Sequence, residues 1–327
     1  MKIIDTTSGF AKLARVKKGC VLSIGNFDGV HLGHQEILAA ARQAAVQRKA
    51  ELMVMTFEPH PLAVLYPQKV PGILTPLPLK KHLLAEFGVD CLCIIKSNPE
   101  LLSLTSKDFV EQFIVRNIRP VVVVEGESFN FGSGRSGRVY TLKKLGIELG
   151  FDVSIIKSRE VKLSTGQTVT VSSTMIRSLL KSGRVEDAAV ALGRPYRLIG
   201  QVVQGRGKGK QLGFPTANLQ PLQQLIPAEG VYAGLVEIGD TDEQVCKTRK
   251  KIPAAFSIIR SEARSSERPL FIEAHLLREE IGTLYGKWLA MDFVKRIRDQ
   301  KKFETDEDLS AQIKRDCEKA RKVLTID

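Results

Sequence analysis

The chain has 327 residues, of which 43% are hydrophobic and 26% charged, with a formal net charge of +13. This length is too great for one ordinary domain and fits two domains of unequal size. The chain contains no apolar run of about 18 residues, and its N-terminus lacks the features of a secretory signal, so we expect a cytoplasmic protein without a membrane span. The positive charge favours anionic partners, namely nucleic acid, anionic lipid or phosphorylated small molecules.

The cysteines are few and scattered. Their number is odd and no CxxC pair occurs, which argues against both a disulfide framework and a zinc site. We expect reduced and mostly buried thiols at Cys20, Cys91, Cys93, Cys246 and Cys317.

The first half of the chain alternates apolar runs with stretches of helical periodicity. Runs at residues 21–27, 51–59, 91–96, 120–124 and 151–156 favour strands, and residues 34–50, 76–89 and 106–118 favour helices. Near-continuous apolar strands separated by helices predict a parallel sheet covered on both faces. Ligands bind such sheets beyond the carboxyl ends of the strands, and the segment GNFDGVHLGH at residues 25–34 follows one of those ends.

The pattern changes after about residue 185. Strand-like segments at 196–205, 230–239, 251–259, 270–278 and 287–297 follow one another without helices, until a helical stretch at 306–324. This order predicts a small antiparallel barrel closed by a C-terminal helix. We therefore expect an α/β domain over residues 1–186 and a barrel domain over residues 187–327.

The segment GNFDGVHLGH combines a glycine-rich turn with two histidines three residues apart. Backbone N–H groups and the helix dipole at such a turn can hold a phosphate. His31 and His34 would share one face of the first helical turn, where imidazoles can stabilise charge at phosphorus during nucleotidyl transfer. Capping or packing histidines are the alternative, and so is a metal pair. A zinc site would need a third ligand, for which His60, His82 and His275 are not convincing.

A second anion-binding pattern lies in VSSTMIR at residues 171–177. Ser172, Ser173 and Thr174 can cap the following helix and offer hydroxyl groups to an anion, while Arg177 can bind phosphate oxygens with its planar fork. A plain helix N-cap is the alternative.

Together, GNFDGVHLGH and SSTMIR resemble the HxGH nucleotidyltransferase superfamily. The segments TFEPHP (56–61) and FNFG (129–132) narrow the resemblance to the bacterial bifunctional riboflavin kinase/FAD synthetases, whose N-terminal Rossmann-like module transfers AMP from ATP to FMN. The resemblance implies catalytic roles for His31 and His34. It implies ATP contacts from Gly25, Asn26, Phe27, Asp28, Gly33, Ser173, Thr174 and Arg177. It implies flavin contacts from Phe57, Pro59, His60, Pro61, Ser128, Asn130 and Arg298.

The second half contains a basic glycine-rich loop, GRGKGKQLG, followed by FPTANL. Glycines permit close approach to phosphate, and Thr216 and Asn218 supply neutral oxygens that suit Mg²⁺ beside a nucleotide. A solvated hairpin connection is the alternative. The segments PTAN, GVYAG and FIEAH also resemble the riboflavin kinase module of the same family. The resemblance implies that Glu273 accepts the proton of the riboflavin 5′-hydroxyl, and that ATP is bound by Gly205, Lys210, Gly213, Thr216 and Asn218.

The sequence differs from that family at two places, and these differences leave other functions possible. Ser128 stands where many members have Asp or Asn, and residues 255–264 replace a Gly-x-x-Pro-Thr-Phe stretch that lines the flavin region. A monofunctional FAD synthetase with a degenerate, flavin-binding or regulatory kinase domain is therefore one alternative. A nucleic-acid-binding barrel is another, although an aromatic content of 6% argues against base stacking. The oligomeric state stays open.

Overall fold

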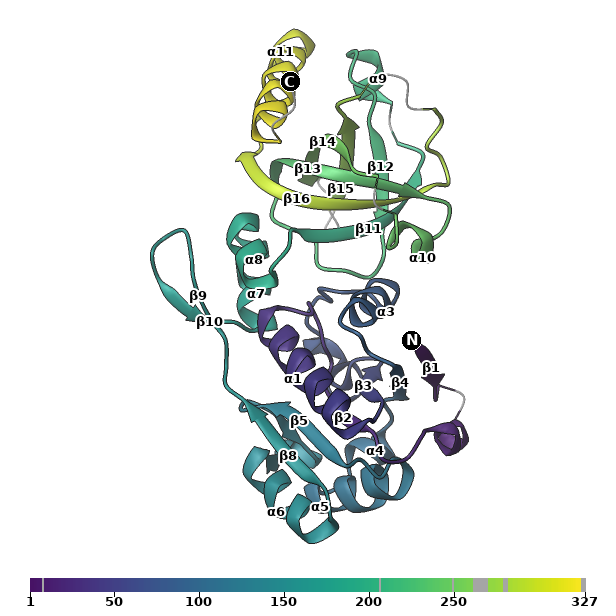
Figure 1. The fold of residues 1–327 in the computed structure, drawn as a ribbon. Coiled ribbons are helices and arrows are strands. Elements are labelled where there is room, and N and C mark those ends of the chain that lie inside the picture. Colours follow the sequence, from purple (N-terminus) through teal and green to yellow (C-terminus); the bar gives the residue numbers. More distant parts are fainter. Residues whose placement is uncertain (8, 206, 249, 261–269, 279–281, 325–327) are drawn as a thin grey trace. The chain divides into compact units, whose positions relative to one another are not determined.

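The computed structural model describes residues 1–7, 9–205, 207–248, 250–260, 270–278 and 282–324. The chain divides into two compact units (Figure 1). The first comprises Met1–Pro71, Lys80–Val161 and Val169–Val171, and the second comprises Gly72–Leu79, Lys162–Thr168 and Ser172–Asp327. Among the described residues, no helix has the length and apolar character needed to cross a membrane.

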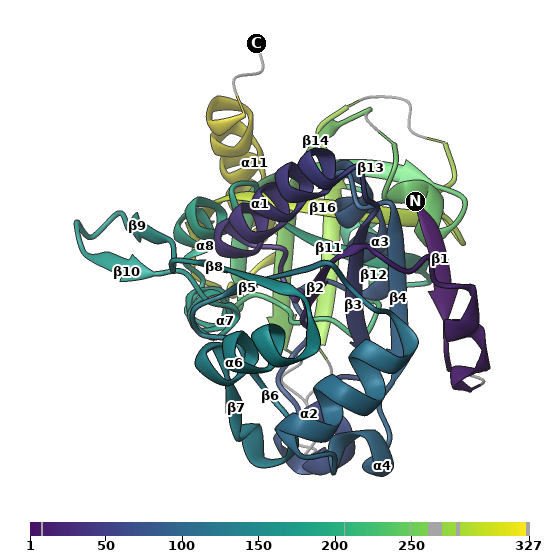
Figure 2. The ribbon, with the colours of Figure 1, turned by 60° about the horizontal axis from the view of Figure 1, so that its bottom comes forward.

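The first unit is built on a six-stranded sheet whose neighbouring strands are all parallel. Its strands are β1 (Lys2–Asp5), β2 (Val21–Ile24), β3 (Leu52–Glu58), β4 (Cys91–Lys96), β5 (Val122–Gly126) and β8 (Asp152–Ile156). Their order is β1-β4-β3-β2-β5-β8, and β2, β3 and β4 can be followed side by side in Figure 2. The order reverses direction between β2 and β5, which makes their carboxyl ends the switch point where such sheets bind ligands.

Helices connect these strands. They are η1 (Phe10–Arg15), α1 (Leu32–Arg48), α2 (Pro61–Leu65), η2 (Pro67–Lys69), α3 (Leu77–Glu86), α4 (Pro99–Leu102), α5 (Ser106–Asp108), the π-helical η3 (Phe109–Val115), η4 (Ser133–Arg135) and α6 (Val139–Leu149). Two short strand pairs are added, β6 (Asn130–Phe131) with β7 (Gly137–Arg138) and β9 (Glu160–Lys162) with β10 (Thr168–Thr170).

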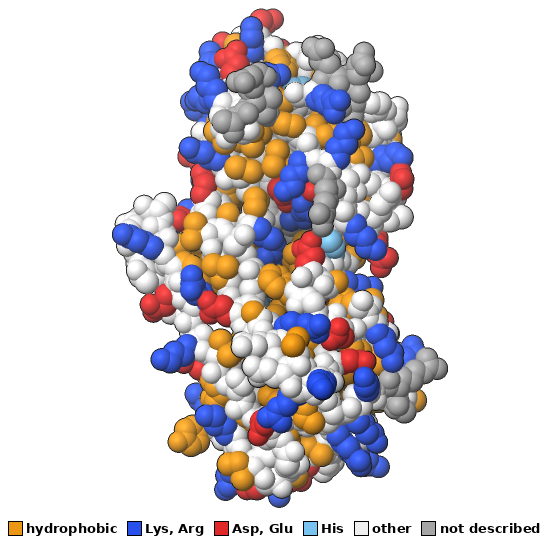
Figure 3. All heavy atoms as spheres, viewed as in Figure 1, with side chains coloured by type: hydrophobic (Ala, Val, Ile, Leu, Met, Phe, Trp, Pro, Cys, Tyr) orange, Lys and Arg blue, Asp and Glu red, His pale blue; other side chains and the backbone are white. Residues whose placement is uncertain are grey.

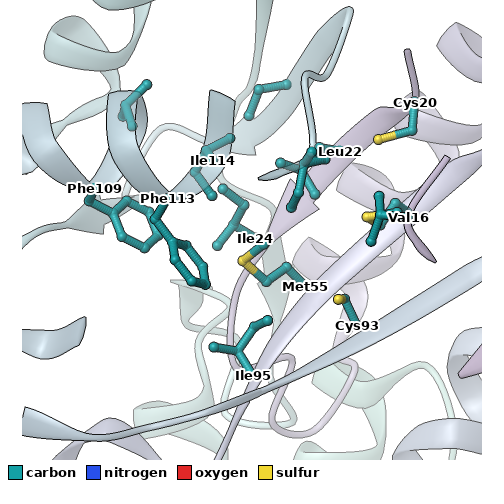
Figure 4. Close-up of a cluster of buried hydrophobic side chains, with 14 of the residues drawn as sticks. Val16, Cys20, Leu22, Ile24, Met55, Cys93, Ile95, Phe109, Phe113 and Ile114 are labelled. Atoms are coloured by element: carbon teal, nitrogen blue, oxygen red, sulfur yellow. The ribbon is translucent and has the colours of Figure 1, made fainter. Parts of the chain in front are cut away.

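Hydrophobic cores lie on both faces of this sheet because strand side chains alternate between them. On one face, Leu22, Ile24 and Met55 pack with Phe109 and Phe113 of η3 (Figure 4). On the other face, α1 lies against β2 and β5 and buries the side chains of Leu38, Ala41 and Ala45.

The second unit contains a closed antiparallel barrel in the order β11-β12-β15-β14-β13-β16. Its strands are β11 (Tyr196–Val203), β12 (Ala217–Pro221), β13 (Gly230–Gly239), β14 (Ile252–Arg260), β15 (Leu270–Leu276) and β16 (Trp288–Arg298). Its helices are α7 (Ser173–Lys181), α8 (Val185–Leu192), α9 (Lys208–Gln211), α10 (Asp242–Val245) and α11 (Asp306–Val323). The C-terminal helix α11 packs on the outside of the barrel, where Cys317 and Ala320 meet Ala233 and Ala255.

The predicted fold class is confirmed, with a parallel-sheet α/β domain followed by an antiparallel barrel and a C-terminal helix. Two strands differ from the prediction because they lack a clear apolar pattern. β1 has only four residues, and β12 contains Asn, Gln and Pro. The stretch predicted as a helix at 106–118 forms α5 and then the wider π-helical turns of η3.

Candidate active sites

The loop at residues 25–31 joins β2 to α1 and ends at His31, the N-cap of α1. The Nδ1 atom of His31 accepts a hydrogen bond from the backbone N–H of His34 at 3.3 Å. The two imidazole rings are stacked, with centroids 3.7 Å apart and planes 15° from parallel. His31 therefore caps the helix and also shares one face of its first turn with His34, with Gly33 between them. Phe27 is buried beneath, its ring 5.2 Å from that of His34.

Backbone strain is concentrated in this loop. Phe27 and Val30 have φ angles of 46° and 40°, and Gly29 has a φ of 91°. A left-handed conformation is unusual for a non-glycine residue and especially costly for β-branched valine. Strain of this kind persists where the surroundings hold a functional segment in one shape, so it supports a binding role for the loop.

Asn26 of this loop contacts His60 of the FEPHP segment. His60 is the N-cap of α2, and its Nδ1 accepts the N–H of Leu62 at 3.1 Å. A neutral His60 then carries its proton on Nε2, which lies 3.0 Å from the Asn26 amide. The structure places Nδ2 of Asn26 at this distance. Because the Nε2 proton needs an acceptor, we assign the amide the opposite way, with Oδ1 toward His60. The Asn26 NH₂ group then takes the other, buried position, which has no partner among the described residues.

A buried lysine lies near two acidic residues beside this loop. Asp28 and Lys80 are 6% and 5% exposed, and Glu58 at the end of β3 is half-buried. Burial lowers the pKa of Lys80, while Asp28 and Glu58 oppose that shift. Burial raises the pKa of Glu58, and Lys80 acts against it. The Lys80 ammonium group thus attracts the carboxylate of Asp28 in GNFDGVHLGH and that of Glu58 in TFEPHP.

The remaining predicted flavin contacts of the first unit lie at the ends of β3 and β5. Phe57 packs against the core shown in Figure 4, and Pro59 and Pro61 follow it. The Asn130 amide donates a hydrogen bond to the backbone oxygen of the exposed Ser128 at 2.5 Å. Between Ser128 and Gly132, the rings of Phe129 and Phe131 are stacked with centroids 5.4 Å apart.

The VSSTMIR segment belongs to the second unit from Ser172 onward. Ser172 is the N-cap of α7, and its Oγ accepts the N–H of Met175 at 3.2 Å. Ser173 and Thr174 form the first turn of the helix. The Nε atom of Arg177 donates to the backbone oxygen of Gly72 at 2.8 Å, which fixes the base of the guanidinium group.

A cavity of about 1180 Å³ opens on the barrel beside the glycine-rich loop. It is lined by residues of β11, β12 and β15 and by residues 282–285, and Gly205, Thr216, Asn218 and His275 are among them. A Cβ atom at Gly205 would lie 1.9 Å from Nδ2 of Asn218, and one at Gly209 would lie 2.9 Å from Oγ1 of Thr216. The loop backbone therefore lies directly on the PTAN segment, which only glycine permits.

Glu273 lies on β15 directly opposite Asn218 of β12 and Ser257 of β14. Its neighbours Ile272 and Ala274 are buried, so Glu273 is on the outward face of the strand, as Asn218 is on β12. Directly opposed residues of antiparallel strands have Cβ atoms about 5 Å apart. The carboxylate of Glu273 is thus close to Asn218, although Glu273 does not itself line the cavity.

Thr216 and Asn218 suit the predicted Mg²⁺, because both line the cavity and provide neutral oxygen atoms, which this ion accepts alongside substrate phosphates. Gly213 has a φ of 84° at the end of the loop. Lys210 belongs to α9, but its side chain lies outside the described residues. The guanidinium group of Arg298, a predicted flavin contact, binds the Asp316 carboxylate at 2.6–3.0 Å and so ties β16 to α11.

Comparison with known proteins matches both halves of the chain. The family model for FAD synthetase matches residues 13–175, and that for riboflavin kinase matches residues 192–324. A bifunctional riboflavin kinase/FMN adenylyltransferase of Escherichia coli K12 is 36% identical over 300 residues, covering 92% of this chain and 91% of that protein. The chain belongs to the bifunctional riboflavin kinase/FMN adenylyltransferase family.

Further relatives agree with this membership. The bifunctional riboflavin kinase/FMN adenylyltransferase of Bacillus subtilis is 34% identical, covering 98% of this chain and 97% of its own length. A crystal structure described as a macrolide-efflux protein from Streptococcus pneumoniae is 28% identical with a TM-score of 0.83, covering 98% and 99% of the two chains. The predicted family and the predicted order of the two modules are confirmed.

The departing segment 255–264 lies within the riboflavin kinase match. Residues 255–260 belong to β14, where Ala255 packs under α11 and Ser257 faces Glu273. Residues 261–264 lie outside the described residues.

The structure also shows functional candidates that the sequence patterns did not reveal. Lys80 and Glu125 are buried charged or titratable residues of the first unit, 5% and 3% exposed. A single acidic residue inside the apolar run VVVVEG was the available signal for Glu125. No comparable signal marks Lys80, because a lysine in a helix is ordinarily exposed.

Proposed function

We propose that this chain catalyses two consecutive reactions. The barrel converts riboflavin and ATP to FMN and ADP, and the α/β unit converts FMN and ATP to FAD and pyrophosphate. Family membership and the matches to both modules support the proposal. The observation that carries it is the stacked pair His31 and His34 at a helix N-terminus beyond the end of β2.

For adenylyl transfer, a phosphate oxygen of FMN attacks the α-phosphorus of ATP and pyrophosphate leaves. Because Nδ1 of His31 accepts the His34 N–H, a neutral His31 holds its proton on Nε2 and can donate it to a phosphoryl oxygen. The Asn26 NH₂ group is buried in this structure and would become a second donor when the loop moves on ATP binding. No covalent enzyme intermediate is required, since the chain positions the two substrates and stabilises charge.

Ser173, Thr174 and Arg177 are proposed to bind ATP phosphates. This assignment is supported by the family resemblance of SSTMIR and by the chemistry of two hydroxyl groups beside a guanidinium fork.

For phosphorylation, the 5′-hydroxyl of riboflavin attacks the γ-phosphorus of ATP. Glu273 is proposed to accept the hydroxyl proton, for which a carboxylate within hydrogen-bond distance suffices. Thr216 and Asn218 would hold Mg²⁺, which offsets phosphate charge when bound. The glycine-rich loop that packs on these two residues would cover the nucleotide.

The charge and the cysteines fit this function in the cytoplasm. ATP, FMN, FAD and pyrophosphate are anions, so a basic surface raises their local concentration. On the face drawn in Figure 3, lysine and arginine side chains are spread among acidic ones, which favours small anionic substrates over a long nucleic acid. The cysteines are free and buried, as expected in a reducing compartment.

The test follows flavin products by chromatography after incubation with riboflavin, ATP and Mg²⁺. We expect the wild type to make FAD, His31→Ala to stop at FMN, and Glu273→Ala to make neither product. Supplying FMN to Glu273→Ala should restore FAD synthesis, which shows that the adenylyl-transfer step of this variant is intact. A wild type that makes FAD only from added FMN would contradict the kinase assignment.

A further inference from the structure

The side chain of Glu125 lies at the switch point of the parallel sheet. Glu125 is on β5 and is 3% exposed. Its Oε1 atom accepts a hydrogen bond from the backbone N–H of Ile24, the last residue of β2, at 2.5 Å. Ile24 directly precedes Gly25 and Asn26, which begin the loop that carries the two histidines.

This bond takes the place of a missing backbone hydrogen bond. Strands β2 and β5 pair only at Val21 with Val122 and at Leu22 with Val123. On the β3 side, the N–H groups of Val21 and Gly25 donate to Glu51 and Met55. Because N–H groups alternate along a strand, that of Ile24 points toward β5, where the ladder has already ended. The Glu125 carboxyl group accepts a hydrogen bond from this N–H at the point where the two strands diverge.

The surroundings disfavour ionisation of the carboxyl group. Burial raises the pKa of Glu125 well above its usual value, and the bond from Ile24 opposes this only in part. The charged residues of the neighbouring strand and of the helices packed on this face are Asp152, Glu111, Lys143, Lys144 and Glu148. Among the described residues, neither these nor other charged groups contribute to the shift. A neutral carboxyl group can accept the N–H through its carbonyl oxygen.

We propose that Glu125 is a positioning residue for adenylyl transfer, which holds Ile24, and with it the start of the histidine loop, at the point where β2 and β5 diverge. This inference rests on the proposed adenylyl transfer. Glu125 acts on the reaction indirectly. Its Oε1 atom already accepts the Ile24 N–H, and its buried side chain does not contact substrate. The loop geometry at Asn26 and His31 depends on that anchor.

Two nearly isosteric substitutions test the anchor. Glu125→Gln keeps a carbonyl oxygen for Ile24, whereas Glu125→Met keeps the shape and removes the acceptor. We expect Glu125→Gln to retain the wild-type kcat/KM for FMN adenylylation, and Glu125→Met to lose about tenfold, which corresponds to about 1.4 kcal/mol. Riboflavin phosphorylation by the same samples is the internal control and should be unchanged. Full activity of Glu125→Met, or equal losses in both variants, would overturn the proposal.

Two measurements test the anchor without relying on activity. Hydrogen exchange at the Ile24 amide should stay slow in the wild type and in Glu125→Gln and become faster in Glu125→Met. In the unfolded chain a glutamate ionises above about pH 4.3, so the folded state binds the extra proton and the wild type loses stability as pH rises. Glu125→Gln should therefore gain stability relative to the wild type as the pH rises above about 4.3.

These readouts separate the two proposals. If the wild type fails to adenylylate FMN but Ile24 exchange follows the expected order, the proposed function is wrong and the anchor stands. If Ile24 exchange is the same in all three proteins, the anchor is absent whatever the activity.

Discussion

For single residues, the orientation of the Asn26 amide decides whether the histidine loop offers phosphate a donor or an acceptor. The hydrogen bond from Leu62 fixes the His60 tautomer, and the Nε2 proton of that tautomer requires Oδ1 of Asn26 as its acceptor, so we assign the amide in that orientation. Asn26→Asp would keep an acceptor for His60 and place a second carboxylate oxygen where the NH₂ group was. We expect kcat/KM for ATP in adenylyl transfer to fall by a factor that corresponds to about 2–3 kcal/mol. The reason is that a hydrogen-bond donor to phosphate is replaced by a negative charge that repels it. Steady-state kinetics with varied ATP measure this loss.

The matched control for that prediction is His60→Asn. Asparagine is a good N-cap, so it keeps the bond to Leu62 that begins α2, but its shorter side chain does not reach Asn26. We expect a loss of no more than about 1 kcal/mol in the same kinetics, because one neutral hydrogen bond is removed. If Asn26→Asp has the KM for ATP of the wild type, the amide is not a phosphate donor.

For loops and strands, the packing of the glycine-rich loop on the PTAN segment gives a second prediction. In Gly205→Ala, the new Cβ atom would overlap the Asn218 side chain, 1.9 Å away, and displace it from the cavity. We expect riboflavin phosphorylation to fall by at least about tenfold, while adenylyl transfer from added FMN is unchanged.

Gly207→Ala is the control within the same loop. Gly207 has a φ of 73°, and no atom of the described residues lies within 4 Å of its Cβ position, so we expect only the backbone cost of about 1 kcal/mol. Both activities are assayed on each protein. Equal kinase losses in the two variants would show that loop flexibility, and not the Asn218 contact, is responsible.

Local patterns predict the elements well and their pairings poorly. The apolar run 91–96 coincides with β4, and the helical stretch at 306–324 coincides with α11 within one residue. The motif spacing also placed His31 and His34 on one face. By contrast, Asn218 faces Glu273 only through the register of β12 and β15, a non-local property set by the whole barrel. The Ile24–Glu125 bond likewise depends on where the β2–β5 ladder stops.

In the whole molecule, two activities belong to two units, each with its own sheet and core. The barrel contains a buried ionic group in which Arg197 binds Asp292 at 2.7 Å and Glu237 at 3.0 Å. The side chains of these residues are 13%, 5% and 3% exposed. Because the three residues come from β11, β16 and β13, this group joins three strands of the barrel.

Removing the cation should therefore destabilise the barrel selectively. Arg197→Met leaves the buried Glu237 carboxylate without its cation and leaves Asp292 with only the more exposed Lys251, 3.3 Å away, which costs about 3–5 kcal/mol. Arg260→Met breaks the exposed pair with Glu229 and should cost less than about 1 kcal/mol. Both proteins are heated in steps, and riboflavin phosphorylation and FMN adenylylation are then assayed on each sample. We expect Arg197→Met to lose phosphorylation at a lower temperature than the wild type while adenylylation persists, because the α/β unit retains its own core. Simultaneous loss of both activities would instead mean that the two units unfold as one cooperative structure.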